Sequence, residues 1–182
     1  LSMRMSVTSE IRFENVSLAS DALLPGTRGL GSALECLNSA RFSIIWGVCG
    51  AAADSLHTAI EYTKSRNQFG KPLAGFQMVQ EKLADMATAL SKAQLFALHL
   101  GRLKDNNQLH WSHVSMGKYS NTRTALEIAR TARDLLGAAG ITDDLSPLRH
   151  AINLETVHTY EGTEHMHQLV LGRHITGLNA IN

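Results

Sequence analysis

Residues 76–100 read FQMVQEKLADMATALSKAQLFALHL and carry the most regular apolar pattern in the chain. Apolar side chains recur there at alternating intervals of three and four residues, at Phe76, Val79, Leu83, Met86, Leu90, Ala93, Ala97 and Leu100. This spacing is a heptad seam, which favours nearly antiparallel helices that cross at about 20°. Glu81, Lys82 and Lys92 stand between the members of the seam as a polar face, and Asp105-Asn106-Asn107 ends the segment. The pattern therefore predicts a long helix inside a bundle.

Further helices are expected on both sides of this seam. The longest apolar run, residues 43–53, is apolar on all sides, as expected of a helix at the centre of a bundle. Pro147 suits the first turn of a later helix, and Gly137-Ala138-Ala139-Gly140 ends an earlier one. The expected helices cover about residues 32–65, 76–105, 110–136, 147–159 and 163–180. The fold class is therefore predicted to be all-α, an up-down helical bundle.

The first residues have a different pattern. Ile11 and Phe13 alternate with Arg12 and Glu14, which is typical of a half-buried strand. We expect residues 1–26 to be a short β remnant and residues 27–182 to form the bundle domain. The abrupt start at Leu1 is expected to be the truncated end of a longer protein.

Composition narrows the function classes. The 182 residues are 44% hydrophobic but only 18% charged, below the roughly 25% of an ordinary globular domain, which suggests that other subunits cover part of the surface. The net charge of +1 points to neither nucleic acid nor a membrane surface. No apolar run reaches the roughly 18 residues of a membrane span, so no membrane insertion is expected.

Cysteine and histidine spacing predicts neither a disulfide nor a metal site. Cys36 and Cys49 would lie roughly 20 Å apart on one helix, so both are expected to be buried thiols in a reducing compartment. His165 and His167 would point to opposite faces of a helix. No cluster completes a zinc ligand set, so no metal is expected.

Glu161 is the first candidate for a catalytic residue. It stands between Tyr160 and Gly162 near the C-terminus. Apolar surroundings disfavour the charged form of a carboxylate and make it a stronger general base. The alternative interpretation is an ordinary glutamate-glycine pair at the end of a helix.

Arg66 and Phe69 form a second candidate site. An arginine fork suits phosphate or pyrophosphate, and an exposed phenylalanine offers a face to a flat ring. The alternative is that Arg66 is only a charge at the end of a helix and that Phe69 is an apolar side chain that packs the turn against the bundle.

Four motifs in order resemble the acyl-CoA dehydrogenase family over essentially the whole chain. They are Arg4-x-Ser6-x-Thr8-x-x-Ile11-x-Phe13-x-x-Val16, Arg66-x-x-Phe69-Gly70-x-x-Leu73 with Phe76-Gln77, Leu136-Gly137-Ala138-Ala139-Gly140-Ile141, and Tyr160-Glu161-Gly162-Thr163. Within the family, the runs CLNSAR, ARDLLG, RHA, NLE and LGRHITG look most like glutaryl-CoA dehydrogenases (residues 36–41, 132–137, 149–151, 153–155 and 171–177).

The resemblance implies an FAD enzyme. Glu161 would remove the α-proton of an acyl-CoA, the β-hydrogen would pass to FAD as hydride, and decarboxylation to crotonyl-CoA could follow. FAD would lie across a subunit interface. The implied cofactor contacts are Arg66, Phe69, Gln77, Asp134, Leu135, Leu136, Gly137, Ala138, Thr163 and His165. The implied substrate contacts are Leu37, Asn38, Arg41, Tyr160 and Gly162.

The resemblance also implies partners and a setting. These are an electron-transfer flavoprotein as acceptor, a homotetramer built as a dimer of dimers, and a role in lysine and tryptophan degradation. The protein would be soluble, in the bacterial cytoplasm or in the mitochondrial matrix of a eukaryote. Residues 1–26 would end the family's β domain, and residues 27–182 would be its C-terminal domain.

Two departures shape the expectations. Relatives usually carry Gly-Gly-x-Gly where this chain has Ala138-Ala139, and His165 stands where Gln or Asp is common. The domains that complete the flavin and acyl pockets are missing, so the chain alone is expected to be inactive. The alternatives are another short- or branched-chain acyl-CoA dehydrogenase and a non-catalytic helical scaffold of the same fold.

Overall fold

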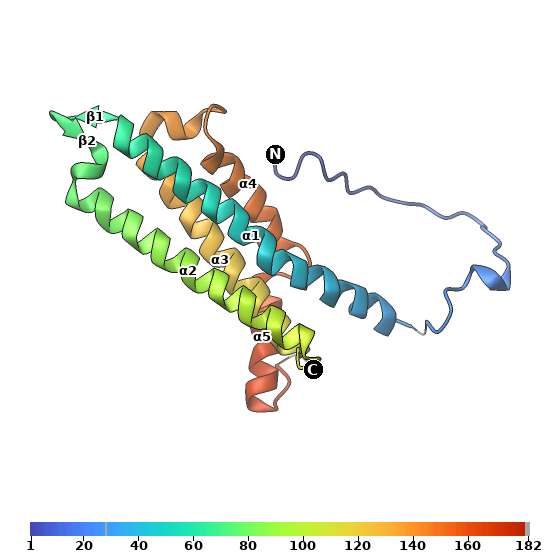
Figure 1. Ribbon diagram of the computed structural model, residues 1–182. Helices are drawn as coiled ribbons and strands as arrows, with labels where there is room; N and C mark the ends of the chain where they lie inside the picture. The colour runs from blue at the N-terminus through green and yellow to red at the C-terminus, as the bar shows by residue number, and fades with distance from the viewer. Residues whose placement is uncertain (28, 181–182) are drawn as a thin grey trace.

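The all-α prediction is confirmed by a computed structural model, which describes residues 1–27 and 29–180. Long helices run side by side along most of the molecule, joined by short connections (Figure 1). The elements in order are η1 Ser20–Ala22, α1 Gly31–Ser65, β1 Asn67–Gln68, β2 Lys71–Pro72, η2 Leu73–Gly75, α2 Gln77–Asp105, α3 Trp111–Leu135, η3 Gly137–Ile141, α4 Ser146–Thr159 and α5 Glu164–Thr176.

The predicted seam of α2 forms its buried face. Met86, Leu90, Ala93, Ala97 and Leu100 are all buried. All five join apolar clusters with side chains of the neighbouring helices: Met86, Leu90 and Ala93 join one cluster, and Ala97 and Leu100 join a second that includes Ile45 of α1. A periodic apolar stripe is buried because its partners remove it from water together.

The central helix of the bundle is α3, which contacts α1, α2, α4 and α5. The expectation that α1 lies at the centre is therefore wrong. Its Trp46 remains 43% exposed, although Ile45, Val48 and Cys49 are buried. The buried face of α3 combines apolar residues such as Val114, Leu126 and Ile128 with small or polar ones, among them Ser112, Ser115, Gly117, Lys118, Asn121 and Thr122. Small side chains allow helices to approach closely, but a hydropathy pattern does not identify small or polar residues as buried.

The predicted strand at residues 11–14 is not formed. Residues 1–27 contain no strand, and Ile11 and Phe13 are exposed. The segment extends away from the bundle (Figure 1) and is tied to it near its start, where Met3 N donates to Asn153 Oδ1 at 2.8 Å. A strand needs a neighbouring strand for its backbone groups. In the described part of the chain β structure is limited to β1 and β2, which pair antiparallel with Gln68 opposite Lys71.

Two smaller expectations also need correction. Cys36 is exposed and only Cys49 is buried. The last helix ends at Thr176 rather than Ala180, because Gly177 adopts a left-handed φ of 73° and its N–H caps Arg173 O at 2.9 Å. The predicted bundle range includes Arg28, Ile181 and Asn182, which lie outside the described residues.

No helix in residues 1–27 and 29–180 has both the length and the apolar character needed to cross a bilayer. The same residues contain no group of three or more metal-ligating side chains.

Candidate functional site

Glu161 lies in the tight connection between α4 and α5. The helices end at Thr159 and begin again at Glu164. Glu161 has a φ of 57° and Gly162 a φ of 90°, so both adopt left-handed backbone conformations. A Cβ on Gly162 would also lie 3.1 Å from His167 Nε2. The backbone conformation therefore favours glycine at position 162, and a Cβ there would press on the His167 ring.

The Glu161 carboxylate is partly buried but remains available. Its side chain is 23% exposed. Oε2 is buried and accepts no hydrogen bond from any described residue. A carboxylate oxygen without a donor keeps its lone pairs free to accept a proton from another molecule.

Arg41 of α1 reaches the same turn. Its Nε donates to Glu161 O at 2.7 Å and lies 3.9 Å from Glu161 Oε2, while its Nη1 donates to Asn38 Oδ1 at 3.2 Å. The structure thus brings together three residues predicted from the sequence, Glu161, Arg41 and Asn38. Leu37, on the same turn of α1, is also half-buried.

An apolar cavity of about 360 Å³ lies beside this turn, between α1 and α4. Tyr160 lines it together with Ile44, Gly47, Leu154 and Val157. Tyr160 and Gly162 were both predicted to contact substrate, and they flank Glu161 directly. Of these three residues Tyr160 lines the cavity, so the apolar space begins one residue before Glu161 in the sequence.

Arg66 and Phe69 lie at the other end of the bundle. Arg66 follows the last residue of α1, and Phe69 stands at the β1–β2 turn with a φ of 50° and 91% of its surface exposed. Figure 1 shows β1 and β2 at the end of the molecule opposite α5. Arg41 and Arg66 are 25 positions apart on or next to one helix, which corresponds to about 37 Å. One chain therefore does not bring Arg66 and Phe69 to its own Glu161.

The remaining residues of the predicted nucleotide site gather near this second end. Gln77 begins α2. Lys82 of α2 donates to Asp134 Oδ2 at 2.7 Å, and this hydrogen bond and the lysine charge hold the pKa of Asp134 below its usual value. Leu135 is half-buried and Leu136 is fully inside the core, so Leu136 could offer only its backbone to a nucleotide.

The glycine loop after α3 has one position that needs glycine for space. Gly140 is packed so closely that a Cβ would lie 2.2 Å from Arg133 O. Gly137 has a φ of 57°. Both it and Ala138 are exposed, and a side chain at position 137 would meet open space.

Thr163 and His165 lie at the Glu161 end, away from the Arg66 group. Thr163 Oγ1 accepts from Met166 N at 3.3 Å and caps α5, whereas His165 is exposed. The ten predicted cofactor contacts therefore form two groups at opposite ends of one chain.

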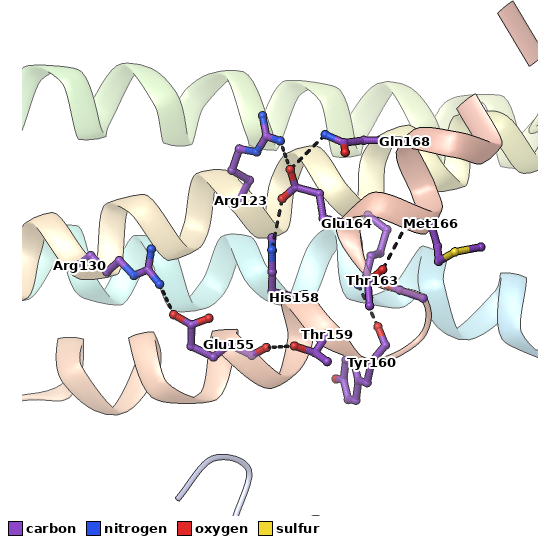
Figure 2. Close-up of polar contacts among 12 residues, drawn as sticks. Arg123, Arg130, Glu155, His158, Thr159, Tyr160, Thr163, Glu164, Met166 and Gln168 are labelled. Atoms are coloured by element: carbon purple, nitrogen blue, oxygen red, sulfur yellow. Dashed lines mark hydrogen bonds and ion pairs between the residues drawn. The ribbon is translucent and has the colours of Figure 1, made fainter. Parts of the chain in front are cut away.

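A polar network that sequence reasoning missed holds the start of α5 against α3 and α4 (Figure 2). Glu164 pairs with Arg123, accepts from Gln168 Nε2 at 3.2 Å, and lies 3.4 Å from His158 Nε2. Burial is the main cause that lowers the pKa of His158, and the charge of Lys118 adds to it. An acidic residue in the first turn of α5 was a visible signal, but nothing in the sequence identifies its partners.

Two further residues at the turn were also missed, Lys118 of α3 and His167 of α5. Lys118 Nζ contacts the carbonyls of Tyr160 and Gly162, and His167 Nε2 lies 3.1 Å from Glu161 O. Both side chains are buried. They come from sequence positions with no local motif, so only the fold reveals them.

The chain is similar in sequence and structure to acyl-CoA dehydrogenases. A short-chain specific acyl-CoA dehydrogenase from mitochondria of Bos taurus is 34% identical over 177 residues, which are 96% of this chain and 43% of that protein. The crystal structure of a glutaryl-CoA dehydrogenase from Mycobacterium smegmatis in complex with FADH2 superposes with a TM-score of 0.91 at 52% identity, over 93% of this chain and 44% of that one.

A third solved structure, described as an electron transferring flavoprotein of Acidaminococcus fermentans, matches with a TM-score of 0.78 at 30% identity, over 81% of this chain and 39% of that one. The chain thus spans less than half the length of the relatives it matches.

The family model for the acyl-CoA dehydrogenase C-terminal domain matches residues 27–176. This range contains all five long helices, the Arg66 turn and the Glu161 turn. The chain therefore belongs to the acyl-CoA dehydrogenase family, through that family's C-terminal domain.

Proposed function

We propose that the protein carrying this chain is an FAD-dependent acyl-CoA dehydrogenase in which Glu161 is the catalytic base. The observation that carries the proposal is the carboxylate itself. Oε2 is buried and accepts no hydrogen bond from any described residue, although Arg41 Nε lies 3.9 Å away, and the neighbouring Tyr160 lines an apolar cavity. A buried carboxylate oxygen needed only for stability would be expected to accept a hydrogen bond.

The chemical role of Glu161 is to take the α-proton of a bound thioester. Arg41 holds the turn by its backbone and lies close enough to stabilise the ionised carboxylate before the proton is taken. Leu37 and Asn38, which lie near Arg41 on α1, and Tyr160, which precedes Glu161, would orient the acyl-CoA. FAD, when bound, supplies the acceptor for the β-hydride.

The exposed groups of this chain fit a flavin nucleotide. The Arg66 guanidinium has no partner among the described residues and could donate to a pyrophosphate, and the Phe69 ring, which contacts Phe76 edge-on, is 91% exposed at the β1–β2 turn. Gln77, Asp134, Gly137 and Ala138 lie toward the same end. Because this group is far from Glu161 within one chain, we propose that a complete site takes the two ends from two subunits. Thr163 and His165 would then meet the nucleotide from the Glu161 side.

The proposed substrate is glutaryl-CoA. The identity of 52% to a glutaryl-CoA dehydrogenase exceeds the 34% to a short-chain enzyme, over similar shares of this chain. A short-chain acyl-CoA is the alternative substrate. Decarboxylation, the electron-transfer flavoprotein acceptor, the dimer of dimers, the degradative role and the compartment stay predictions.

The test uses the whole protein that contains this sequence. Purified protein is expected to retain FAD by absorbance and to reduce a dye acceptor faster with glutaryl-CoA than with butyryl-CoA at equal concentration. Faster turnover with butyryl-CoA would replace the substrate and keep the enzyme class. A protein without FAD and without turnover on either thioester would favour the scaffold alternative.

A further inference from the structure

The turn that carries Glu161 has three successive backbone carbonyls, and each accepts a hydrogen bond from a side chain on another element. Lys118 Nζ donates to Tyr160 O at 2.9 Å and to Gly162 O at 2.8 Å. Arg41 Nε donates to the carbonyl between them, Glu161 O, at 2.7 Å. The donors come from α3 and α1, so the turn is fixed from two sides.

His167 completes this arrangement. Its Nε2 lies 3.1 Å from Glu161 O, and since a carbonyl only accepts, Nε2 must carry the hydrogen. Burial lowers the pKa of His167 to about 4, and the charges of Lys118 and Arg41 add to this effect, so the ring is neutral at pH 7. A neutral ring with hydrogen on Nε2 is a single tautomer, which makes it a fixed donor.

Lys118 is the least expected member, because its side chain is only 1% exposed. Burial, with a smaller effect from the charge of Arg41, lowers its pKa to about 8. An ammonium group that is removed from water is costly even when it is hydrogen-bonded, and an apolar side chain of similar volume often serves stability equally well. Packing alone therefore does not account for a lysine at this position.

The geometry of the two Lys118 contacts supplies an account. The ammonium bridges the carbonyls on either side of Glu161 and so fixes the backbone across Glu161 and Gly162, which both have positive φ. None of the four hydrogen bonds uses the Glu161 carboxylate as acceptor, and Oε2 accepts no hydrogen bond from any described residue. These bonds hold the backbone of the turn and do not engage the proposed base.

We propose that Lys118 is a positioning residue for Glu161. The Lys118 ammonium orients the Glu161 carboxylate by holding the carbonyls of Tyr160 and Gly162. The inference rests on the proposed function, since it concerns the aim of the proposed base. A misplacement of about 1 Å in a reacting group can cost about 100-fold in rate. Removal of the ammonium is therefore expected to lower kcat more than it changes KM.

The test compares two buried polar residues one turn apart on α3, in the whole flavoprotein. Lys118→Met removes the ammonium and keeps a long, unbranched side chain. Asn121→Leu is the matched control, because Asn121 Nδ2 donates to Ile45 O at 3.2 Å and to Ala93 O at 3.0 Å, both outside the turn that carries Glu161. Lys118→Gln keeps an uncharged N–H donor on a side chain that is one bond shorter than lysine.

Dye reduction with glutaryl-CoA is measured per bound flavin. We expect Lys118→Met to lower kcat by about 100-fold and Lys118→Gln by at least about 10-fold, with KM within about threefold of wild type. Asn121→Leu is expected to lower the melting temperature and to leave kcat per flavin unchanged. Glu161→Gln is run in parallel, so that failure of the base assignment is seen separately.

Three results would overturn the inference. One is a wild-type kcat in either Lys118 variant while Glu161→Gln is inactive. Another is an equal loss of kcat in Asn121→Leu, which would make the effect one of general packing. The third is a loss of flavin and helix content in both Lys118 variants to the same degree, which would make Lys118 a folding residue.

Discussion

Replacement of Gly162 by alanine is expected to strain the turn that carries Glu161. The φ of 90° at Gly162 is a conformation that non-glycine residues adopt at a cost of about 1–3 kcal/mol. The new Cβ would also lie 3.1 Å from His167 Nε2, so the ring must shift and weaken its bond to Glu161 O, worth about 0.5–1.5 kcal/mol. Together these effects give a destabilisation of about 2–4 kcal/mol.

The assay is thermal unfolding of the whole protein, followed by circular dichroism and by flavin release. One kcal/mol corresponds to about 2–4 °C in a domain of this size, so the melting temperature of this domain should fall by about 5–15 °C. Gly172→Ala is the control, because Gly172 lies inside α5 without a positive φ and with nothing within 4 Å of a new Cβ. Alanine there should raise stability by up to about 1 kcal/mol.

The reasoning is refuted if Gly162→Ala melts at the wild-type temperature or higher. It is also refuted if Gly172→Ala destabilises the protein as much as Gly162→Ala does, since the effect would then not depend on the conformation of the turn.

Three further predictions follow from contacts elsewhere in the bundle. Gly140→Ala should destabilise the end of α3, because its Cβ would lie 2.2 Å from Arg133 O; a melting temperature equal to that of wild type would contradict this. The free energy of unfolding should fall as pH falls from about 6.5 to about 4, because His167 has a pKa of about 4 in the folded protein and about 6.5 in the unfolded chain. Urea unfolding measured across this range should show a smaller dependence of stability on pH in His167→Gln than in wild type. An unchanged pH dependence in the variant would count against the prediction. Residues 1–182 alone should neither retain FAD nor reduce dye with glutaryl-CoA. Robust turnover by this chain would contradict the expectation that it is inactive by itself.

The helices were largely predictable because their signals are local. The apolar seam of α2 repeats over 25 residues, and the polar residues from Asp105 onward predict the end of the helix, which the structure places at Asp105. The central place of α3 could not be predicted in the same way. Its buried face contains Lys118 and Asn121, which become favourable only when other elements supply hydrogen-bond acceptors.

The strand expected at residues 11–14 shows a second limit of local patterns. Alternation of Ile11 and Phe13 with charged residues describes a surface that could be half-buried, but burial needs a partner sheet. In this structure those side chains face solvent. An alternating apolar pattern identifies a potential strand, and the rest of the fold determines whether that strand forms.

The candidate site was predictable in its motifs and not in its supports. Glu161, Arg41 and Asn38 were all identified from the sequence, and the structure places them together. Lys118 lies 43 positions before Glu161 and carries no motif of its own. Its role depends on a contact between α3 and the α4–α5 turn, which is a property of the packed bundle.

The central claim is that Glu161 takes the α-proton, and single-turnover flavin reduction tests it most directly. Whole protein with bound FAD is mixed rapidly with glutaryl-CoA, and the loss of flavin absorbance is compared between wild type and Glu161→Gln. A general base contributes about 100- to 10,000-fold, so the variant should retain FAD and reduce it at least about 100-fold more slowly. Glu155→Gln, which removes a carboxylate of α4 that is paired with Arg130, should reduce flavin at the wild-type rate. Wild-type flavin reduction in Glu161→Gln would contradict the account.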